Sequence, residues 1–263
     1  MAQRPWAVVT GASSGLGVDF ARQLVTRGWN LVLTARRADR LEQLAATLRQ
    51  QGAEVVVCPC DLQDPAGRDV LWQAATANNR PLTLWVNNAG FGGHQDFAEA
   101  DWARWQGMID LNISALTDLT WRFVRHAQAH GQRARVLQVA SIGAWMPSPY
   151  MSVYTATKSY VRDFTAALSI ELAGSSVTCH VLCPGPTRTE FVESASMTVP
   201  KGGDLAFMDS APVVQDGLNA LFADKTIRVS GLLNRVTCAV SNLAPQTLVA
   251  RIAMLTVGRP ARK

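Results

Sequence analysis

The sequence of 263 residues lacks the marks of several protein classes. No run approaches the roughly 20 apolar residues of a membrane-spanning helix. The first apolar stretch, 6–9, is predicted to be a strand, so we expect no signal peptide. Internal repeats and linkers are also absent. Charged residues make up 17% and hydrophobic residues 48%, which excludes a disordered chain and indicates one globular domain over 1–263.

Cysteine is scarce and lacks paired C-x-x-C spacing. The five thiols are Cys58, Cys60, Cys179, Cys183 and Cys238. An odd number without that spacing fits neither a disulfide framework nor a zinc site. We therefore expect reduced thiols, no metal and a cytoplasmic protein.

Positive charge is in modest excess. The formal net charge of +5 favours anionic ligands, such as a phosphorylated cofactor. The excess is too small and too evenly spread to indicate nucleic acid, and no nucleic-acid partner is expected.

Short apolar runs alternate with longer helical patterns along the chain. Strands are predicted at 6–10, 30–35, 54–60, 82–88, 135–141 and 178–185, and helices near 16–27, 38–51, 65–78, 101–130 and 154–173. Continuous apolar strands separated by helices are typical of a parallel sheet covered on both faces. The predicted fold is therefore α/β, a doubly wound, Rossmann-like sheet in a single domain.

A glycine-rich loop, TGASSGLG, joins the first predicted strand to the first helix. Gly11 permits the tight turn, and Gly15 and Gly17 let the backbone approach a pyrophosphate at the helix N-terminus. Ser13 and Ser14 add hydroxyl donors, and Leu16 lies between the last two glycines. A plain strand-to-helix turn is the alternative, but the position of the loop favours nucleotide binding.

An acid for the ribose hydroxyls is missing at the end of the second predicted strand. Ala35 takes its place, and Arg36 and Arg37 follow. Guanidinium groups can grip a 2′-phosphate, so NADP is the predicted cofactor. Further on, Asp61 and Leu62 could meet the adenine edge, although an aspartate there could also cap the next helix.

Tyr154 and Lys158 lie four residues apart, one turn along a predicted helix face. An ammonium near a phenol favours phenolate, so we expect a lowered pKa for Tyr154. Such a phenol can exchange a proton with an alcohol or a carbonyl. An isolated Y-x-x-x-K is more often the start of an ordinary helix. Other motifs must therefore decide whether this pair is catalytic.

The motifs together resemble the short-chain dehydrogenase/reductase family, in its one-domain branch. They are TGASSGLG, Asp61, NNAG at 87–90, Asn112, Ser141, Tyr154 with Lys158, and PGPTRT at 184–189, in the family's order. Each motif alone is weak evidence for the family, whereas the ordered set over residues 5 to 190 is strong evidence.

The resemblance implies a role for each catalytic candidate. Tyr154 would be the general acid in carbonyl reduction, and Lys158 would hold the nicotinamide ribose. Ser141 would donate a hydrogen bond to the carbonyl oxygen. Asn112 would distort its helix and anchor a water that relays protons to Lys158. A helix cap at Ser141 and a satisfied buried amide at Asn112 are the structural alternatives.

The resemblance also implies further contacts with NADP(H). Asn88, Ala89 and Gly90 would lie along the adenosine side, and Asn87 would tie strands together. The carboxamide would be oriented by a set after the sixth strand: Pro184, Gly185, Thr187 and Thr189.

Apolar side chains surround the segment that would line the substrate cleft. They are Phe91, Trp145, Met146, Pro147, Pro149, Tyr150, Met151, Phe191, Met197, Phe207 and Met208, about half of which we assign to the ordinary core. The segment 186–212 is predicted to be a lid. A lipophilic ketone, aldehyde or 3-oxoacyl group is the expected substrate.

The C-terminal extension, about 241–258, is predicted to be a helix with Leu248, Val249, Ile252 and Leu255 on one face. It could pack on its own domain or a partner, close the substrate cleft, or lie on a membrane surface beside the basic tail. The three tryptophans of 101–130, Trp102, Trp105 and Trp121, suggest a homodimer or homotetramer.

The sequence thus predicts an NADP(H)-dependent oxidoreductase that moves a hydride between the nicotinamide and a carbonyl or alcohol. The alternative is an NADP-sensing regulatory or interaction protein on the same fold. Sensors of this kind usually lose the tyrosine or the lysine, and both are present. A third hypothesis, a membrane-scaffolding protein, is supported only by the C-terminal helix.

Overall fold

A seven-stranded parallel sheet forms the centre of the computed structural model, which describes residues 4–191 and 207–260. In sheet order the strands are β3 (Val55–Pro59), β2 (Asn30–Ala35), β1 (Trp6–Thr10), β4 (Leu82–Asn87), β5 (Ala134–Val139), β6 (Val177–Cys183) and β7 (Ile227–Val229). The order reverses between β1 and β4, where ligands of doubly wound sheets bind. The predicted fold class is confirmed.

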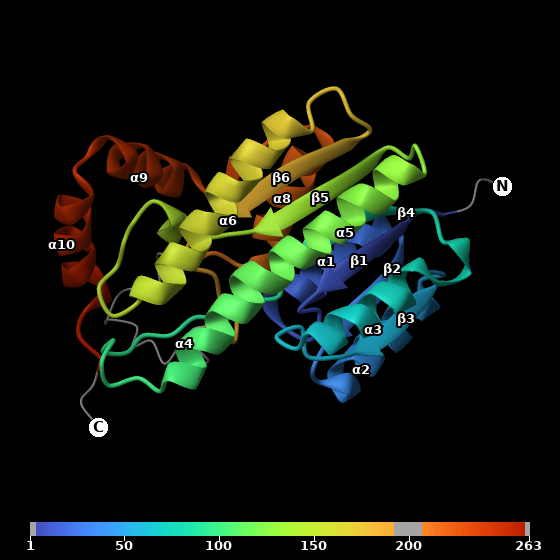
Figure 1. The fold of residues 1–263 in the computed structure, drawn as a ribbon, viewed down its shortest axis with the longest axis horizontal. Helices are drawn as coiled ribbons and strands as arrows, with labels where there is room; N and C mark the ends of the chain where they lie inside the picture. The colour runs from blue at the N-terminus through green and yellow to red at the C-terminus, as the bar shows by residue number, and fades with distance from the viewer. Residues whose placement is uncertain (1–3, 192–206, 261–263) are drawn as a thin grey trace.

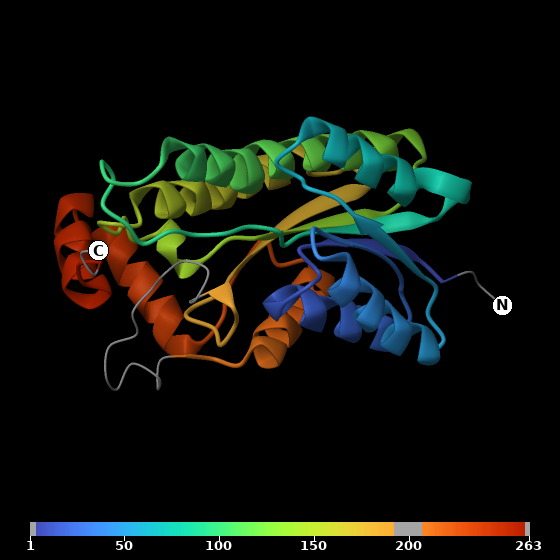
Figure 2. The ribbon, with the colours of Figure 1, turned by 90° about the horizontal axis from the view of Figure 1, so that it is seen from below.

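Helices cover both faces of the sheet (Figure 2). One layer contains α1 (Gly15–Thr26), α2 (Ala38–Gln50) and α8 (Ser210–Phe222). The other contains α3 (Pro65–Thr76), α4 (Trp102–Ile109), α5 (Leu116–Ala129) and α6 (Ser152–Glu171). Short helical turns, η1 (Ala77–Asn79) and η3 (Ile142–Ala144), complete the connections.

The apolar strands supply a core on each side because successive residues of a strand point to opposite faces. In β1, Val9 packs into the cluster with Phe20 of α1, and Val8 packs into the cluster with Phe123 of α5. All five β1 residues are buried. Burial on both faces explains why the strands read as continuous apolar runs.

The single helix predicted over 101–130 is interrupted. A π-helical segment, η2 (Asp110–Ala115), separates α4 from α5. This segment contains Asn112, where the family resemblance implies a local distortion. The interruption was invisible to hydrophobic spacing because the apolar face continues on either side of it.

The C-terminal part holds more structure than predicted. α8 and β7 had no counterpart among the predicted elements, since Pro212 and Gly217 obscure the helical pattern and β7 has only three residues. The predicted extension at 241–258 contains one of two helices, α9 (Leu232–Leu243) and α10 (Gln246–Val257). In Figure 1 the arrows of β5 and β6 point toward this pair.

Candidate active site

The three residues with the clearest chemical signature meet at the carboxyl end of β5. Ser141 directly follows the strand region and caps η3, and its Oγ accepts a hydrogen bond from the Gly143 amide at 3.1 Å. Tyr154 lies in the first turn of α6, with its phenol close enough to the Ser141 hydroxyl for the serine to affect its pKa. Lys158 follows one turn later, with Nζ donating to the Val139 carbonyl at 2.9 Å. The structure therefore brings together the predicted serine, tyrosine and lysine.

The electrostatics of this group differ from the sequence expectation. Burial raises the pKa of Tyr154 to about 12, and the nearby Ser141 hydroxyl opposes the rise. The predicted lowering of this pKa by Lys158 is wrong here, because the ammonium points to Val139 and lies over the phenol ring, 5.8 Å from its centroid. Burial also lowers the pKa of Lys158 to about 8. Both shifts favour the neutral side chain.

Asn112 connects the π-helical segment to the loop after β4. Its Nδ2 donates to the Phe91 carbonyl and to Thr157 Oγ1, each at 3.0 Å, and its Oδ1 accepts from the Phe91 amide at 3.2 Å. A Cβ on Gly90 would come within 2.9 Å of that oxygen and 3.4 Å of Lys158 Nζ. Asn112 therefore lies beside Lys158, as a proton relay would require, and the relay itself stays a prediction.

The glycine-rich loop is a close-packed turn. Gly11 has φ +67° and Gly15 has φ +52°, a region that favours glycine. A Cβ on Gly15 would lie 3.0 Å from Thr189, so the loop faces the segment after β6. Gly17 is also tightly packed, because a Cβ there would collide with the Gly11 carbonyl oxygen. Its approach to a ligand stays a prediction.

The other predicted members of the loop occupy distinct places. Ser14 precedes α1 in extended conformation, and its side chain makes no cap hydrogen bond. Leu16 packs against the core on the α1 side. Ser13 accepts hydrogen bonds from Arg37. Only the serines and backbone amides therefore remain to meet an anionic ligand.

The asparagines after β4 hold the sheet together at the switch point. Asn87 accepts from the Trp85 indole and donates to Thr120 and Gln138, which confirms that it ties strands together. Asn88 Nδ2 donates to the carbonyl of Thr10 at 2.8 Å. The side chain of Asn88 thus supports the glycine-rich turn, and Ala89 and Gly90 continue along the same edge.

The 2′-phosphate candidates are not equivalent. Arg36 is exposed, whereas Arg37 is half-buried and donates from Nε and Nη2 to Ser13 Oγ at 3.2 and 3.1 Å. Arg37 Nη1 also pairs with Glu190 at 2.9 Å, and Arg40 pairs with the other oxygen of this carboxylate. These two guanidinium groups hold the pKa of Glu190 below its usual range.

Arg40 and Glu190 were missed by sequence reasoning. Glu190 lies 153 residues after Arg37, so no local pattern could join them. A phosphate and this carboxylate would compete for the same guanidinium groups.

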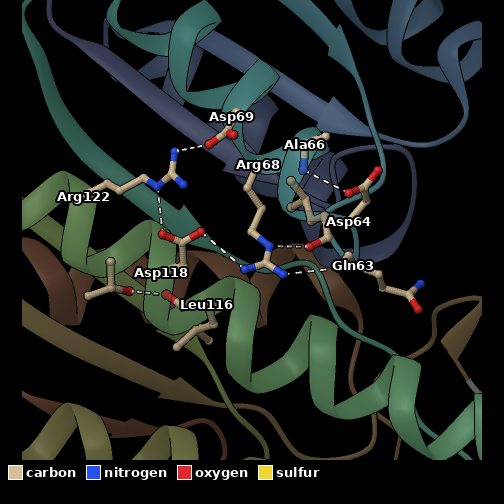
Figure 3. Close-up of polar contacts among 10 residues, drawn as sticks. Gln63, Asp64, Ala66, Arg68, Asp69, Leu116, Asp118 and Arg122 are labelled. Atoms are coloured by element: carbon tan, nitrogen blue, oxygen red, sulfur yellow. Dashed lines mark hydrogen bonds and ion pairs between the residues drawn. The ribbon is translucent and has the colours of Figure 1, made fainter.

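A network of charged residues supports the loop after β3 (Figure 3). Arg68 donates to the carbonyls of Leu62 and Gln63 at 3.0 and 3.2 Å and pairs with Asp118 of α5 at 3.4 Å. Asp118 in turn binds Arg122. The network anchors the loop expected at the adenine edge to the helix layer.

The two residues predicted at the adenine edge differ in exposure. Asp61 is exposed and its Oδ1 accepts from the Gln63 amide at 3.0 Å. The helix cap is Asp64 instead, which accepts from the Ala66 amide. Leu62 is buried in the core, so its side chain cannot face a ligand. A contact of Leu62 with adenine would have to use its backbone.

The residues after β6 form a turn beside the glycine loop. Pro184 accepts from the Ile142 amide at 2.9 Å, and Thr187 Oγ1 donates to the Gly185 carbonyl at 2.9 Å. Thr189 accepts from the Phe191 amide. This turn lies between Ser141 and Gly15, where a nicotinamide carboxamide is predicted.

The predicted lid falls largely on residues 192–206, including Met197, which lie outside the described residues. Its two ends are held together, since Arg188 donates to the Met208 carbonyl and Met208 to the Pro186 carbonyl, both at 2.9 Å. Residues 210–212 belong to α8 and not to a lid. The lid function stays a prediction.

An apolar wall surrounds Tyr154. Trp105, Met108 and Met151 pack with it, and Phe191 lies over its ring at 5.3 Å between centroids. Other predicted pocket residues are elsewhere: Trp145 packs under α6 against Val161, and Met208 packs against the core on the α1 side. Tyr150 has φ +64°, a strained conformation for a tyrosine in a loop at this site.

The chain belongs to the short-chain dehydrogenase family: the family model named short chain dehydrogenase matches residues 5–199. The family and the fold are those of an NADP-dependent oxidoreductase acting on a carbonyl or an alcohol.

Individual relatives agree with this class. Sulfoacetaldehyde reductase 2 of Chromohalobacter salexigens is 32% identical over 232 residues, covering 87% of this chain and 91% of the relative. A very-long-chain 3-oxoacyl-CoA reductase of Pyricularia oryzae is 30% identical over 182 residues, covering 67% and 54%. A short-chain dehydrogenase of Sphingobium yanoikuyae, solved with NADPH, superposes with a TM-score of 0.81 at 27% identity and 98% coverage of both chains.

Proposed function

We propose that the protein reduces a lipophilic ketone, aldehyde or 3-oxoacyl compound with NADPH. The observation that carries the proposal is the position of Tyr154, which is enclosed by apolar side chains and lies between Ser141 and the buried Lys158. A carbonyl oxygen could accept from both hydroxyls while its apolar substituents contact Phe191 and Met151.

The residues fit NADP(H). The positive φ of Gly11 and Gly15 forms a cradle that a side chain would obstruct, and Arg37 with Ser13 offers charged and neutral donors for a 2′-phosphate. Bound NADPH supplies the hydride. The turn with Thr187 and Thr189 would hold the carboxamide, and Lys158 the ribose.

The chain's own residues supply the proton and its control. Tyr154 keeps its proton at neutral pH because burial raises its pKa, so the phenol can donate to the developing alkoxide. Ser141 Oγ already accepts from Gly143, which leaves its hydrogen for the phenol or the substrate oxygen. Lys158, with its lowered pKa, can replace the phenol proton through Asn112 and a water.

The name of one relative favours a fatty substrate. The Pyricularia oryzae protein is a very-long-chain 3-oxoacyl-CoA reductase, which agrees with the apolar wall around Tyr154. The Chromohalobacter salexigens protein is named for a small anionic aldehyde, and the wall at Tyr154 argues against such a substrate here.

The partner and compartment predictions are also part of the proposal. Short-chain dehydrogenases are commonly oligomeric, and Trp102 and Trp121 are 65% and 56% exposed on α4 and α5, where a homodimer or homotetramer could form. Trp105 is buried and belongs to the site instead. All five cysteines are free, which supports a reducing compartment such as the cytoplasm.

Oxidation of NADPH at 340 nm against a panel of lipophilic ketones, aldehydes and 3-oxoacyl thioesters tests the function. Tyr154→Phe should lower kcat by about 10²–10⁴-fold with NADPH affinity nearly unchanged, because the phenol donates a proton. Tyr160→Phe is the matched control, since Tyr160 lies on the same helix, hydrogen-bonded to Thr117. It should keep wild-type turnover.

Two outcomes would contradict the proposal. Turnover that survives Tyr154→Phe would remove the tyrosine from the chemistry. Tight NADPH binding without turnover of any panel member would favour the sensor alternative.

A further inference from the structure

The last two helices carry much of the exposed apolar surface. Eight of the sixteen large hydrophobic side chains that are exposed among the described residues lie on α9 and α10. They are Leu232, Leu233, Val236, Val240 and Leu243 of α9 and Leu248, Ile252 and Leu255 of α10. Leu243 and Leu255 are 87% and 85% exposed, so these residues are not packing onto their own domain.

α9 turns its apolar face outward. Leu232, Val236, Val240 and Leu243 follow the spacing of one helix face. Cys238 lies on the other side of the helix and is buried. An ordinary surface helix has the opposite arrangement, with its aliphatic face inward. The exposed face therefore requires another apolar surface to cover it.

The net positive charge of the chain is concentrated in the same segment. No aspartate or glutamate follows Asp224, and five basic residues follow Gly231. They are Arg235, Arg251, Arg259, Arg262 and Lys263. Five positive charges account for the whole formal net charge of +5, so residues before this segment sum to zero. The sequence expectation of an evenly spread charge is therefore wrong.

We propose that α9 and α10 dock on the surface of an anionic bilayer. Exposed aliphatic side chains can enter the boundary of the acyl chains while arginines meet the lipid phosphates, the combination typical of interfacial helices. Arg235 and Arg251 are exposed on these two helices. No described helix is long and apolar enough to cross a bilayer, so the contact is peripheral.

Charge also decides against a second copy of the chain as the occupant. Two such segments face to face would bring together like charges with no acidic residue in either segment to offset them. An anionic lipid surface supplies the missing negative charge.

The two helices that carry the docked face adjoin the active site through their inner side. Asn234 of α9 packs against Gly185 of the turn after β6. At the end of α10, the Gly258 carbonyl is 3.2 Å from His94 Nε2, on the loop that follows Phe91. A lipophilic substrate, which the proposed function assumes, can pass from the bilayer to Tyr154 without crossing water.

Co-sedimentation of the full chain with vesicles tests the docking without any turnover. Two kinds of vesicle are compared: pure phosphatidylcholine, and phosphatidylcholine with about 30% phosphatidylglycerol. The second has enough anionic lipid to attract basic segments. We expect binding to the first at least 10-fold stronger, and weaker binding in high salt.

Matched variants distinguish vesicle binding through α9 and α10 from nonspecific binding by other exposed apolar residues. Leu233→Ser with Leu243→Ser should lower the vesicle partition coefficient by on the order of 10-fold or more, because two exposed leucines leave the interface. Val70→Ser with Ile170→Ser is the control, since these residues are 50% and 76% exposed on other helices. It should bind as wild type. Arg235→Gln with Arg251→Gln should remove most of the preference for anionic vesicles.

Absence of vesicle binding, or equal binding by both leucine and control variants, would overturn the proposal. Sedimentation velocity identifies the rival occupant: an oligomer lost only in the leucine variant, without vesicle binding, would assign the face to a second copy. Melting curves confirm that each variant is folded. Because binding is read without substrate, failure of the docking and failure of the reductase proposal are distinguishable.

Discussion

At the scale of single residues, burial sets the charge of Tyr154 and Lys158. The structure raises the pKa of Tyr154 to about 12 and lowers that of Lys158 to about 8, in both cases mainly by desolvation. Tyr154 therefore stays protonated through the physiological range, as an acid for carbonyl reduction must. Lys158 changes charge close to neutral pH, so it is the residue that makes the site sensitive to pH.

The pH dependence of reduction should report Lys158. The ammonium is present below its pKa, and as pH rises through about 8 the group becomes neutral and ceases to attract the anionic cofactor. We expect kcat/KM for NADPH, which reports the free enzyme, to fall by up to about tenfold per pH unit above that value. In Lys158→Arg the fall should move beyond pH 10, since arginine stays charged. A profile of the wild type that is flat to pH 10 would exclude this role.

Arg37, rather than Arg36, should determine the preference for NADPH over NADH. Arg37 is the residue held by Ser13 and Glu190, whereas Arg36 is exposed. Loss of a charged contact worth roughly 1.5–3 kcal/mol should narrow the ratio of the two kcat/KM values by about 10–100-fold in Arg37→Ala. Arg36→Ala is the control, with an expected change of less than about 3-fold. The reverse ranking would place the phosphate on Arg36.

At the scale of elements, the glycine-rich turn between β1 and α1 is tightly packed as well as being the predicted cofactor-binding loop. Gly17 approaches the Gly11 carbonyl, which closes the turn, and Asn88 after β4 binds the carbonyls of Thr10 and Gly11. Three segments of the chain therefore share this small volume. The requirement for glycine at position 17 comes from these neighbours and not from its own backbone angles.

Gly17→Ala should destabilise the protein although alanine is the better helix former. Its Cβ meets backbone that cannot move away cheaply, so we expect a loss of about 2–4 kcal/mol in the free energy of unfolding. Gly107→Ala is the matched control in α4, because there the Cβ collides with the end of the flexible Gln63 side chain and is in ordinary contact with Phe91 at 3.7 Å. It should stay within about 1 kcal/mol of wild type in urea unfolding. Equal losses would mean that the contact of Gly17 with Gly11 is not the cause.

At the scale of the whole molecule, one sheet separates two cores and gathers the site at one edge. The cluster on each face joins helices that are separated in the chain, such as α1 with α8 on one face and α3 with α5 on the other. At the carboxyl edge lie the glycine loop, Ser141 and the turn after β6. α9 and α10 extend beyond this edge (Figure 1), which is why a surface for lipid can adjoin the site without interrupting either core.

The sequence by itself determined the order of the first six strands and of the helical regions between them, the glycine turn and the serine, tyrosine and lysine. These features depend on periodicity and on short spacings, such as the four residues between Tyr154 and Lys158. The absence of an acid after β2 is equally local, and it was sufficient to indicate NADP.

Only the tertiary structure decided what depends on residues far apart in the chain. It brought Glu190 to Arg37, placed Phe191 over Tyr154 and enclosed Lys158 so that its pKa falls. It also turned the leucines of α9 outward, although their spacing alone would suit an inward face. Burial and neighbours are properties of the folded chain, and no pattern within one segment contains them.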